Sequence, residues 1–266
     1  MSTNRPPAVA GMFYPANPAE LSAGICALLA DADAGASTRL PKALIVPHAG
    51  YVYSGPVAAK AYARLAPLAG RIKRVVLLGP VHHVPVRGLA LPQAVAFTTP
   101  LGEIPLDTAA MAELAGLPQV SRSDAAHAPE HSLEVHLPFL QTVLGSFRLL
   151  PLAVGNATAE EVAGVLERVW GGEETLIVIS SDLSHFLSYD VARRVDRQTV
   201  EHILALQPDL DHEQACGATP VNGLLAFAGR HALQSELLDL RNSGDTAGDK
   251  ARVVGYAAIA FYESAR

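Results

Sequence analysis

The stretch ALIVPHAGYVYSG, residues 43–55, starts as an apolar strand and continues with side chains that a protein core does not require. Residues 43–47 are almost entirely aliphatic, which is typical of a short strand covered on both faces. His48 follows at once, and Tyr51 and Tyr53 come shortly after it. In open α/β sheets, ligands bind beyond the carboxyl ends of the strands. The stretch therefore indicates a buried strand whose far end carries functional side chains.

Similar aliphatic runs recur along the chain and alternate with helical patterns, which predicts an α/β fold. The other strand candidates are 74–79, 89–99, 147–155, 175–181, 236–242 and 253–262. We expect the segment 89–99 to form an antiparallel hairpin, so that the sheet is mixed. The prediction is one three-layer domain over residues 1–266, with a mixed, mainly parallel central sheet flanked by helices.

Helix starts are predicted where a side chain that can accept backbone N–H groups precedes an apolar periodic stretch. Three such caps are Ser54, Asp107 and Thr158, and Thr158 has the capping-box spacing with Glu161. The helix after Ser54 would carry a proline in its first turn. A longer helix is predicted over residues 189–206 from its apolar stripe.

Composition excludes several classes of protein. The 266 residues carry a formal charge of -6 without a basic cluster, which argues against a nucleic-acid partner. No run approaches the roughly eighteen apolar residues of a membrane span. The N-terminus lacks the apolar core of a secretory signal. Two cysteines make no disulfide framework, so we expect a cytoplasmic protein.

Three of the predicted strands run directly into histidines. His48 follows the first strand, the pair His82 and His83 follows the second, and His185 follows a third, shortly after Asp182. If these strands are parallel, the imidazoles emerge at one edge of the sheet. Neutral imidazole binds zinc, iron, copper or nickel, so we expect a shared mononuclear site. Two adjacent histidines do not easily face one pocket, and we expect His83 to be the structural member of its pair.

The segment PEHSLEVHLPFL, residues 129–140, adds a second group of ionisable side chains. His131 and Glu134 would share one face of a helix because they are three residues apart. The order of residues differs from the His-Glu-x-x-His motif of zinc proteases. We therefore expect His131 or Glu134 to orient a ligand ring from behind rather than to bind the metal.

Cys216 lies in QACGATPVNG, just before a predicted helix. A thiol near a helix N-terminus and a cation has a lowered pKa and is available to a metal or an oxidant. A small buried apolar side chain is the alternative, and the residues around Cys216 leave both readings open. Asp182 is a candidate base, a partner of His185 or a turn residue at the end of its strand.

With these residues in place, the sequence resembles the MEMO family, whose prokaryotic members are called AmmeMemoRadiSam system protein B. The resemblance covers essentially the whole chain. It rests on motifs that occur in order: RPPAVAGMFYP (5–15), PHAGYVYSG (47–55), LLGPVHHVP (77–85), EHSLEVHLPFL (130–140), SSDLSH (180–185), ACGATPV (215–221) and VVGYAAIAFY (253–262). The family fold is similar to that of class III extradiol dioxygenases, which are non-haem iron enzymes.

The resemblance implies a metal site made of His48, His82 and Cys216, with the catalytic residues His185 and Asp182 in the same pocket. It implies one transition metal ion, with iron preferred over copper and zinc as a further option. This chain has Val81 where the family often has serine. A thiolate in place of the dioxygenase carboxylate also shifts metal preference toward softer ions.

By the same resemblance, a substrate or peptide surface maps to Phe13, Tyr14 and Tyr53. The family name further suggests AMMECR-type and radical SAM proteins as partners. Three functions fit these residues: a mononuclear iron or copper redox enzyme acting on an unknown small molecule, a metal-dependent hydrolase, and a non-enzymatic module that binds a peptide or partner protein. We expect the first, with His185 as acid or base and Asp182 orienting it.

Overall fold

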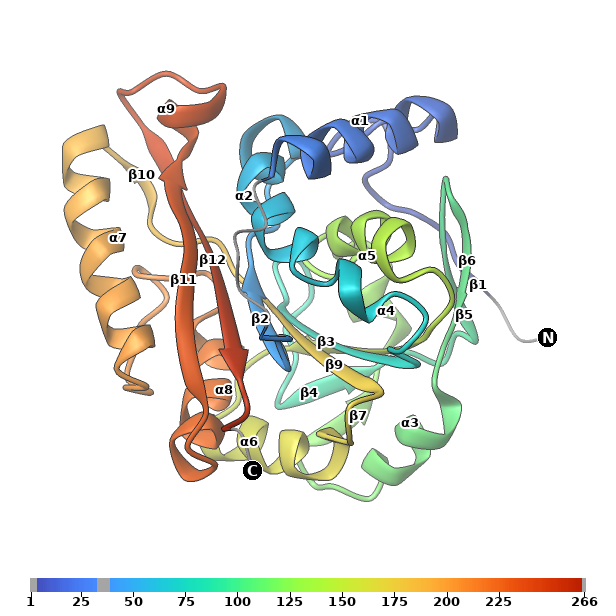
Figure 1. Cartoon of the computed structure of the whole chain (residues 1–266). Helices are drawn as coiled ribbons and strands as arrows, with labels where there is room; N and C mark the ends of the chain where they lie inside the picture. The colour runs from blue at the N-terminus through green and yellow to red at the C-terminus, as the bar shows by residue number, and fades with distance from the viewer. Residues whose placement is uncertain (1–3, 33–38, 265–266) are drawn as a thin grey trace.

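The computed structural model describes residues 4–32 and 39–264. Its main sheet has nine strands in the order β10-β12-β2-β9-β3-β8-β4-β7, with β11 paired to β12 (Figure 1). The strands of this sheet are β2 (Ala43–Val46), β3 (Arg74–Pro80), β4 (Leu89–Leu91), β7 (Val120–Arg122), β8 (Arg148–Val154), β9 (Thr175–Ser180), β10 (His185–Leu187), β11 (Gln234–Asn242) and β12 (Val253–Tyr262).

The centre of the sheet is parallel and its outer parts are antiparallel. β9 pairs in parallel with both β2 and β3, and β3 pairs in parallel with β8. β12 runs antiparallel to β2, and β4 runs antiparallel to β8. Every residue of β2 and β9 is buried, as expected for aliphatic strands covered on both faces. The predicted mixed α/β sheet flanked by helices is confirmed.

Helices cover both faces of this sheet (Figure 1). The helices α1, α2 and α5 pack together on one face, whereas α6 and α8 pack together on the other. α7 lies against β11 and β12, and α3 contacts α6. Their bounds are α1 (Pro18–Asp31), α2 (Tyr51–Ala63), α3 (Thr108–Leu114), α4 (Asp124–His127), α5 (Leu137–Leu144), α6 (Ala159–Val169), α7 (Tyr189–Leu204), α8 (Ala218–Arg230) and α9 (Ser243–Thr246), with short 3-10 turns η1 (Ala66–Leu68) and η2 (Glu134–His136).

The predicted hairpin over residues 89–99 does not form. β4 belongs to the main sheet, whereas the segment after it enters a separate sheet of three strands, β1 (Asn4–Arg5), β5 (Ala96–Thr99) and β6 (Gly102–Pro105). The antiparallel hairpin in this region is β5–β6. The reason is that β4 finds partners far along the chain, in β7 and β8, so that local pairing does not decide its position.

Two of the three predicted helix caps are confirmed. Asp107 accepts the backbone N–H of Ala110 at the start of α3, and Thr158 forms the full capping box with Glu161 at α6. The cap at Ser54 is wrong, because α2 already begins at Tyr51. The backbone carbonyl of Gly50 accepts the first helical N–H groups, so Ser54 lies inside the helix and donates to the Ala49 carbonyl at 2.8 Å.

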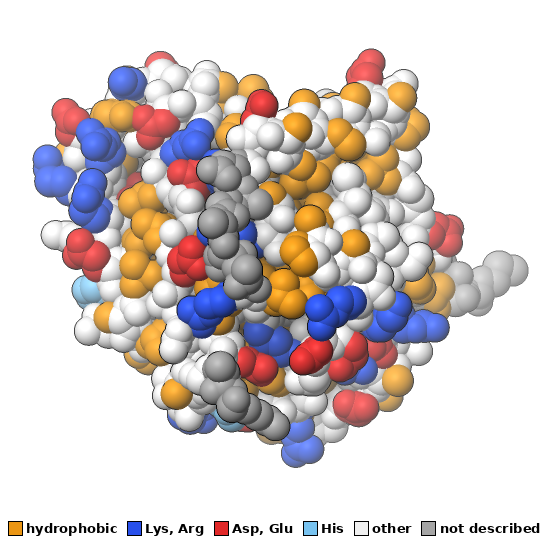
Figure 2. Space-filling view, viewed as in Figure 1, with side chains coloured by type: hydrophobic (Ala, Val, Ile, Leu, Met, Phe, Trp, Pro, Cys, Tyr) orange, Lys and Arg blue, Asp and Glu red, His pale blue; other side chains and the backbone are white. Residues whose placement is uncertain are grey.

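Within the described part of the chain, no helix combines the length and the apolar character needed to cross a bilayer. The face shown in Figure 2 carries lysine and arginine side chains over α7 interspersed with carboxylates. This face therefore has no broad surface of one charge sign.

Candidate metal centre

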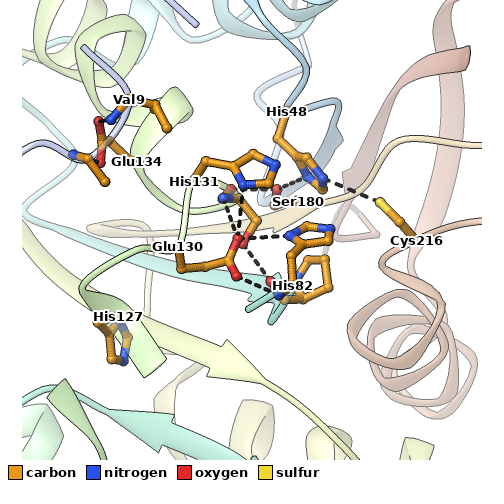
Figure 3. A network of polar contacts seen from close by, with 12 residues as sticks. Val9, His48, His82, His127, Glu130, His131, Glu134, Ser180 and Cys216 are labelled. Atoms are coloured by element: carbon orange, nitrogen blue, oxygen red, sulfur yellow. Dashed lines mark hydrogen bonds and ion pairs between the residues drawn. The ribbon is translucent and has the colours of Figure 1, made fainter. Parts of the chain in front are cut away.

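Three imidazoles meet beyond the carboxyl ends of the parallel strands (Figure 3). His48 follows β2, His82 follows β3, and His131 comes from the loop between α4 and η2. One ligand nitrogen from each ring lies within 4.8 Å of the other two, close enough for all three to hold one metal ion. The ring centroids of His48 and His82 are 5.3 Å apart, and those of His82 and His131 are 4.6 Å apart. The convergence expected for the first two rings is therefore present.

The ring of His48 is held from behind by the hydroxyl of Ser180, the last residue of β9. The Ser180 Oγ donates to the Ser132 carbonyl at 2.6 Å, which uses its single proton. The same oxygen lies 2.6 Å from His48 Nδ1 and 2.8 Å from His136 Nε2, so both ring nitrogens must donate to it. This pattern assigns the proton of neutral His48 to Nδ1 and leaves Nε2 with a free lone pair.

His136 continues this hydrogen-bond chain into the core. Because its Nε2 donates to Ser180, its Nδ1 is an acceptor, and the Tyr62 hydroxyl donates to it at 2.7 Å. Tyr62 and His136 are both fully buried. The orientation of His48 is thus connected through Ser180 to an aromatic side chain deep in the fold.

The carboxylate of Glu130 holds the rings of His82 and His131 from behind, as Ser180 holds that of His48. It accepts His82 Nδ1 at 2.8 Å and the His82 backbone N–H at 2.6 Å, and it lies 3.4 Å from His131 Nδ1. Burial works to raise the pKa of Glu130, but the hydrogen bonds and charge of His82 outweigh it and lower the pKa to about 2. A permanent carboxylate acceptor fixes the proton of neutral His82 on Nδ1 and leaves Nε2 free.

The buried rings of the cluster are neutral at ordinary pH. Burial lowers the pKa of His48 well below its usual value, and the neighbouring histidines lower it further. Burial, with the charge of His82, lowers the pKa of His131 to about 4. Metal ions bind neutral imidazole, so protons do not compete for these two rings near neutral pH.

Cys216 lies beside the cluster. Its Sγ is 3.3 Å from His48 Nε2, and it accepts the backbone N–H of Asp182 at 3.3 Å. Burial, followed by the charge of Asp182, raises the pKa of the thiol to about 12. In the metal-free protein the direction of this shift agrees with the alternative of a small buried side chain rather than with a lowered thiol pKa. Gly217 is needed next to it, because a Cβ there would lie 2.5 Å from the Ser180 carbonyl oxygen.

Asp182 and His185 lie at the same sheet edge but do not pair as expected. Asp182 Oδ1 accepts the backbone N–H of His48 at 2.7 Å, whereas His185 Nδ1 donates to the Leu183 carbonyl at 2.8 Å. The acceptor within hydrogen-bond distance of this ring nitrogen is a backbone carbonyl two residues earlier in the chain, and the Asp182 carboxylate is occupied by the backbone of His48. Burial raises the pKa of Asp182 to about 7, against the lowering effect of the backbone N–H groups of His48 and Ala49.

The predicted orienting roles are distributed differently from our expectation. His131 is one of the three clustered rings, and Glu130 lies behind them instead of Glu134. Glu134 accepts the N–H groups of Ala8 and Val9, and its carboxylate forms a buried ion pair with Arg5. It thus anchors the N-terminal segment.

The three aromatic residues expected at a substrate or peptide surface lie in different environments. Phe13 lies against the His131 ring at 4.8 Å, and Tyr53 is exposed on α2. Tyr14 is buried and donates its hydroxyl to Glu134 at 2.5 Å, so it is not available at the surface. His83 is exposed, with its ring 6.1 Å from that of His131.

Sequence reasoning gave no role to Ser180, Glu130 or His136. Ser180 and Glu130 stand in motifs that were recognised, but both residue types are common in turns and at helix ends. The signal that identifies them is their contact with a histidine far along the chain, and that contact requires the fold. Ser132 is a further case, since its hydroxyl donates to the Pro80 carbonyl at 2.7 Å and ties the two loops together.

The residues present suit a transition metal ion. Three imidazole nitrogens are offered, two with their far N–H groups already committed to acceptors, and a sulfur lies at the edge. Imidazole and sulfur donors favour iron, copper, zinc or nickel over magnesium and calcium, which prefer oxygen. Three protein ligands also leave coordination positions for a small molecule.

Comparisons with known proteins show which family this chain resembles. Residues 5–260 match the Memo family model, described as Memo-like protein. The chain is 39% identical to a MEMO1 family protein of Methanopyrus kandleri, with 97% of this chain and 98% of that protein covered. It is 35% identical to a MEMO1 family protein of Aquifex aeolicus, with the same coverage.

Among solved structures, an uncharacterized protein from Escherichia coli K12 has a similar fold, with a TM-score of 0.52. Its sequence is 15% identical, and the match covers 83% of this chain and 99% of that one. At this identity the likeness concerns the fold alone. The family match and the near full-length relatives together establish that the chain belongs to the Memo family.

Proposed function

We propose that the protein binds one transition metal ion at His48, His82 and His131 and catalyses redox chemistry on a small organic molecule. The observation that supports this most strongly is the preorganisation of the imidazoles, because Ser180 and Glu130 hold two of them in the ligand tautomer. Iron is the preferred ion, with copper next and zinc third. When bound, such a metal would supply electron transfer and activation of oxygen.

The protein side of this chemistry is proton transfer and orientation. Asp182 is the group best suited to exchange a proton, since its pKa of about 7 lies near the working pH. His185 donates through Nδ1 to a backbone carbonyl, so its Nε2 is left to accept a proton. We propose both as acid–base residues. Cys216 adjoins the ligands and is the candidate to replace His131 as third donor.

A metal-dependent hydrolase is the second candidate. A three-histidine set with an open position is also the ligand set of hydrolytic zinc, and Asp182 would then take the proton of the attacking water. The two functions share the site and differ in the metal and in oxygen consumption.

The test is elemental analysis of full-length protein purified without oxygen, comparing wild type with His82→Ala, His131→Ala and Cys216→Ala. We expect about one iron or copper per chain in wild type, loss in both histidine variants and retention in Cys216→Ala. His83→Ala is the matched control, because His83 is exposed and outside the cluster.

Other outcomes assign the site differently. Loss of metal in Cys216→Ala with retention in His131→Ala would restore the His48, His82 and Cys216 set. Zinc together with no oxygen uptake would favour the hydrolase. A wild-type protein that takes up no metal from iron, copper or zinc solutions would overturn both functions and leave the peptide-binding module.

A further inference from the structure

We propose that a hollow beside Cys216 binds an uncharged, mainly apolar organic molecule that carries a hydroxyl group. The hollow lies between the ends of β3 and β8 and the loop that leads into α8, and it measures about 380 Å³. It rests on the proposed function in one respect only, namely that the bound molecule would be the one presented to the metal. Apart from Cys216, its walls come from residues to which no role in metal binding is assigned.

The walls of the hollow are largely aliphatic on one side. Val81 follows β3, Val86 lies in the loop after it, and Val154 ends β8. Two prolines, Pro80 and Pro85, complete this side. A wall of this kind removes apolar ligand surface from water, which is the main source of affinity for small organic molecules.

The hollow also carries the exposed amide of Asn156, which can donate and accept, and, on the opposite side, the side chains of His212 and Thr219, which bond to one another. His212 Nδ1 lies 3.2 Å from the Cys216 carbonyl and must donate to it, which leaves Nε2 as acceptor for the Thr219 hydroxyl, also at 3.2 Å. The Thr219 oxygen therefore keeps lone pairs but has no proton left to donate. It can accept a hydrogen bond from a ligand hydroxyl.

Among the residues that the structure describes, those that line the hollow carry no carboxylate, lysine or arginine. A charged ligand would lose hydration there without gaining a counter-charge, which is unfavourable. The aliphatic wall, the acceptor oxygen of Thr219, the Asn156 amide and this lack of charge together favour a neutral alcohol or phenol, whose hydroxyl can donate to the first and accept from the second. The volume is at the small end for ligand pockets, which suits a molecule of about one ring.

The hollow and the metal cluster share one wall. Cys216 lines the hollow, and its Sγ lies 3.3 Å from His48 Nε2. Val81, on the other side, directly precedes His82. A molecule in the hollow would thus contact Cys216, which adjoins His48, and Val81, the residue before His82.

The test uses three probes of similar shape and different charge: benzyl alcohol, benzoate and benzylammonium. Each is titrated into full-length protein with and without metal, and the methyl signals of Val81, Val86 and Thr219 are followed by NMR. We expect saturable shifts with benzyl alcohol, at an affinity about tenfold higher than for either ion. Equal affinity for benzoate or benzylammonium, or shifts confined to other methyl groups, would overturn the proposal.

Two substitutions locate the binding. Val86→Trp should fill the hollow and weaken benzyl alcohol by about tenfold or more, whereas Val95→Trp, at an exposed site elsewhere, should not. Thr219→Val keeps the shape, removes the acceptor and should weaken binding by roughly threefold to tenfold. Unchanged affinity in both hollow variants would refute the site.

The proposal fails separately from the metal site. His82→Ala should lose the metal yet still bind benzyl alcohol, because His82 does not line the hollow. Metal binding without alcohol binding would therefore reject the hollow and leave the metal centre intact.

Discussion

The hydroxyl of Ser180 has a geometric role that no other side chain of the site shares. It has one proton and two lone pairs, and a carbonyl and two imidazoles use all three. A fully used hydroxyl cannot rotate without breaking a buried hydrogen bond, and such a loss costs about 1–3 kcal/mol. His48 therefore presents the same nitrogen to the cluster before any ion arrives.

Ser180→Ala should weaken metal binding by about 10-fold to 100-fold, because the ring of His48 loses the acceptor that fixes its tautomer. A competition titration against a chelator of known affinity measures this directly. Ser188→Ala is the matched control, since Ser188 is exposed and makes no side-chain cap at α7. Equal metal affinity in the two variants would show that the hydrogen bonds of Ser180 do not contribute to metal binding.

At this scale the sequence predicts the ligands better than the residues that hold them. His48 and His82 could be expected because each follows an aliphatic strand, which is a local signal. Ser180 could not, because its partners His136 and Ser132 lie 44 and 48 residues away. The raised pKa of Cys216 also could not be predicted from the sequence, because it depends mainly on burial in the folded protein.

Among the elements, the N-terminal segment supports the loop that carries His131. Arg5 donates to the carbonyls of His127 and Glu130 and pairs with the carboxylate of Glu134. These acceptors lie on both sides of His131 in the sequence, and Phe13 packs against its ring. The third imidazole is thus held by a segment that begins more than a hundred residues earlier.

Arg5→Met should destabilise the fold by about 3–5 kcal/mol, because it leaves the buried carboxylate of Glu134 without its cation. Urea denaturation followed by circular dichroism measures the change. Arg71→Met removes an exposed ion pair with Glu173 and should change stability by less than about 0.5 kcal/mol. A similar small effect for Arg5→Met would contradict the anchoring role.

The elements themselves were predicted unevenly. Strands with continuous aliphatic runs and helices with side-chain caps were correct, since both signals are local. The hairpin over residues 89–99 was wrong, because β4 pairs with β8 more than fifty residues away. The start of α2 was wrong because a backbone carbonyl, that of Gly50, begins the helix in place of a side chain.

Across the whole molecule, buried titratable groups of two kinds oppose one another. Burial lowers the pKa values of five histidines: His48, His127, His131, His136 and His185. Burial raises the pKa of Asp182 to about 7 and that of Asp196 to about 6. The histidines stabilise the fold above their unfolded pKa of about 6.5, and this stability is lost as the pH falls. The aspartates act in the opposite direction between about pH 4 and their folded pKa values.

Near pH 5, His48, His127, His131 and His136 bind protons only when the chain is unfolded, and the lowered pKa of His185 acts in the same direction. Asp182 and Asp196 keep their protons only when folded. The net excess of at least two protons in the unfolded chain favours unfolding, so metal-free protein should lose roughly 3 kcal/mol of stability or more per pH unit near about pH 5. Urea midpoints at several pH values test this. A free energy of unfolding that stays level or rises on acidification would refute the prediction that the buried histidines outweigh the buried aspartates.

The strand order has one more consequence. β9 lies between β2 and β3 and is hydrogen-bonded to both, so the two histidine-bearing strand ends are always two inter-strand spacings apart, roughly 10 Å. The hydrogen-bonded backbone of these three strands therefore fixes the distance across the site, whichever side chains the strand ends carry. Exchanging one donor for another would alter which ion is preferred while leaving that span unchanged.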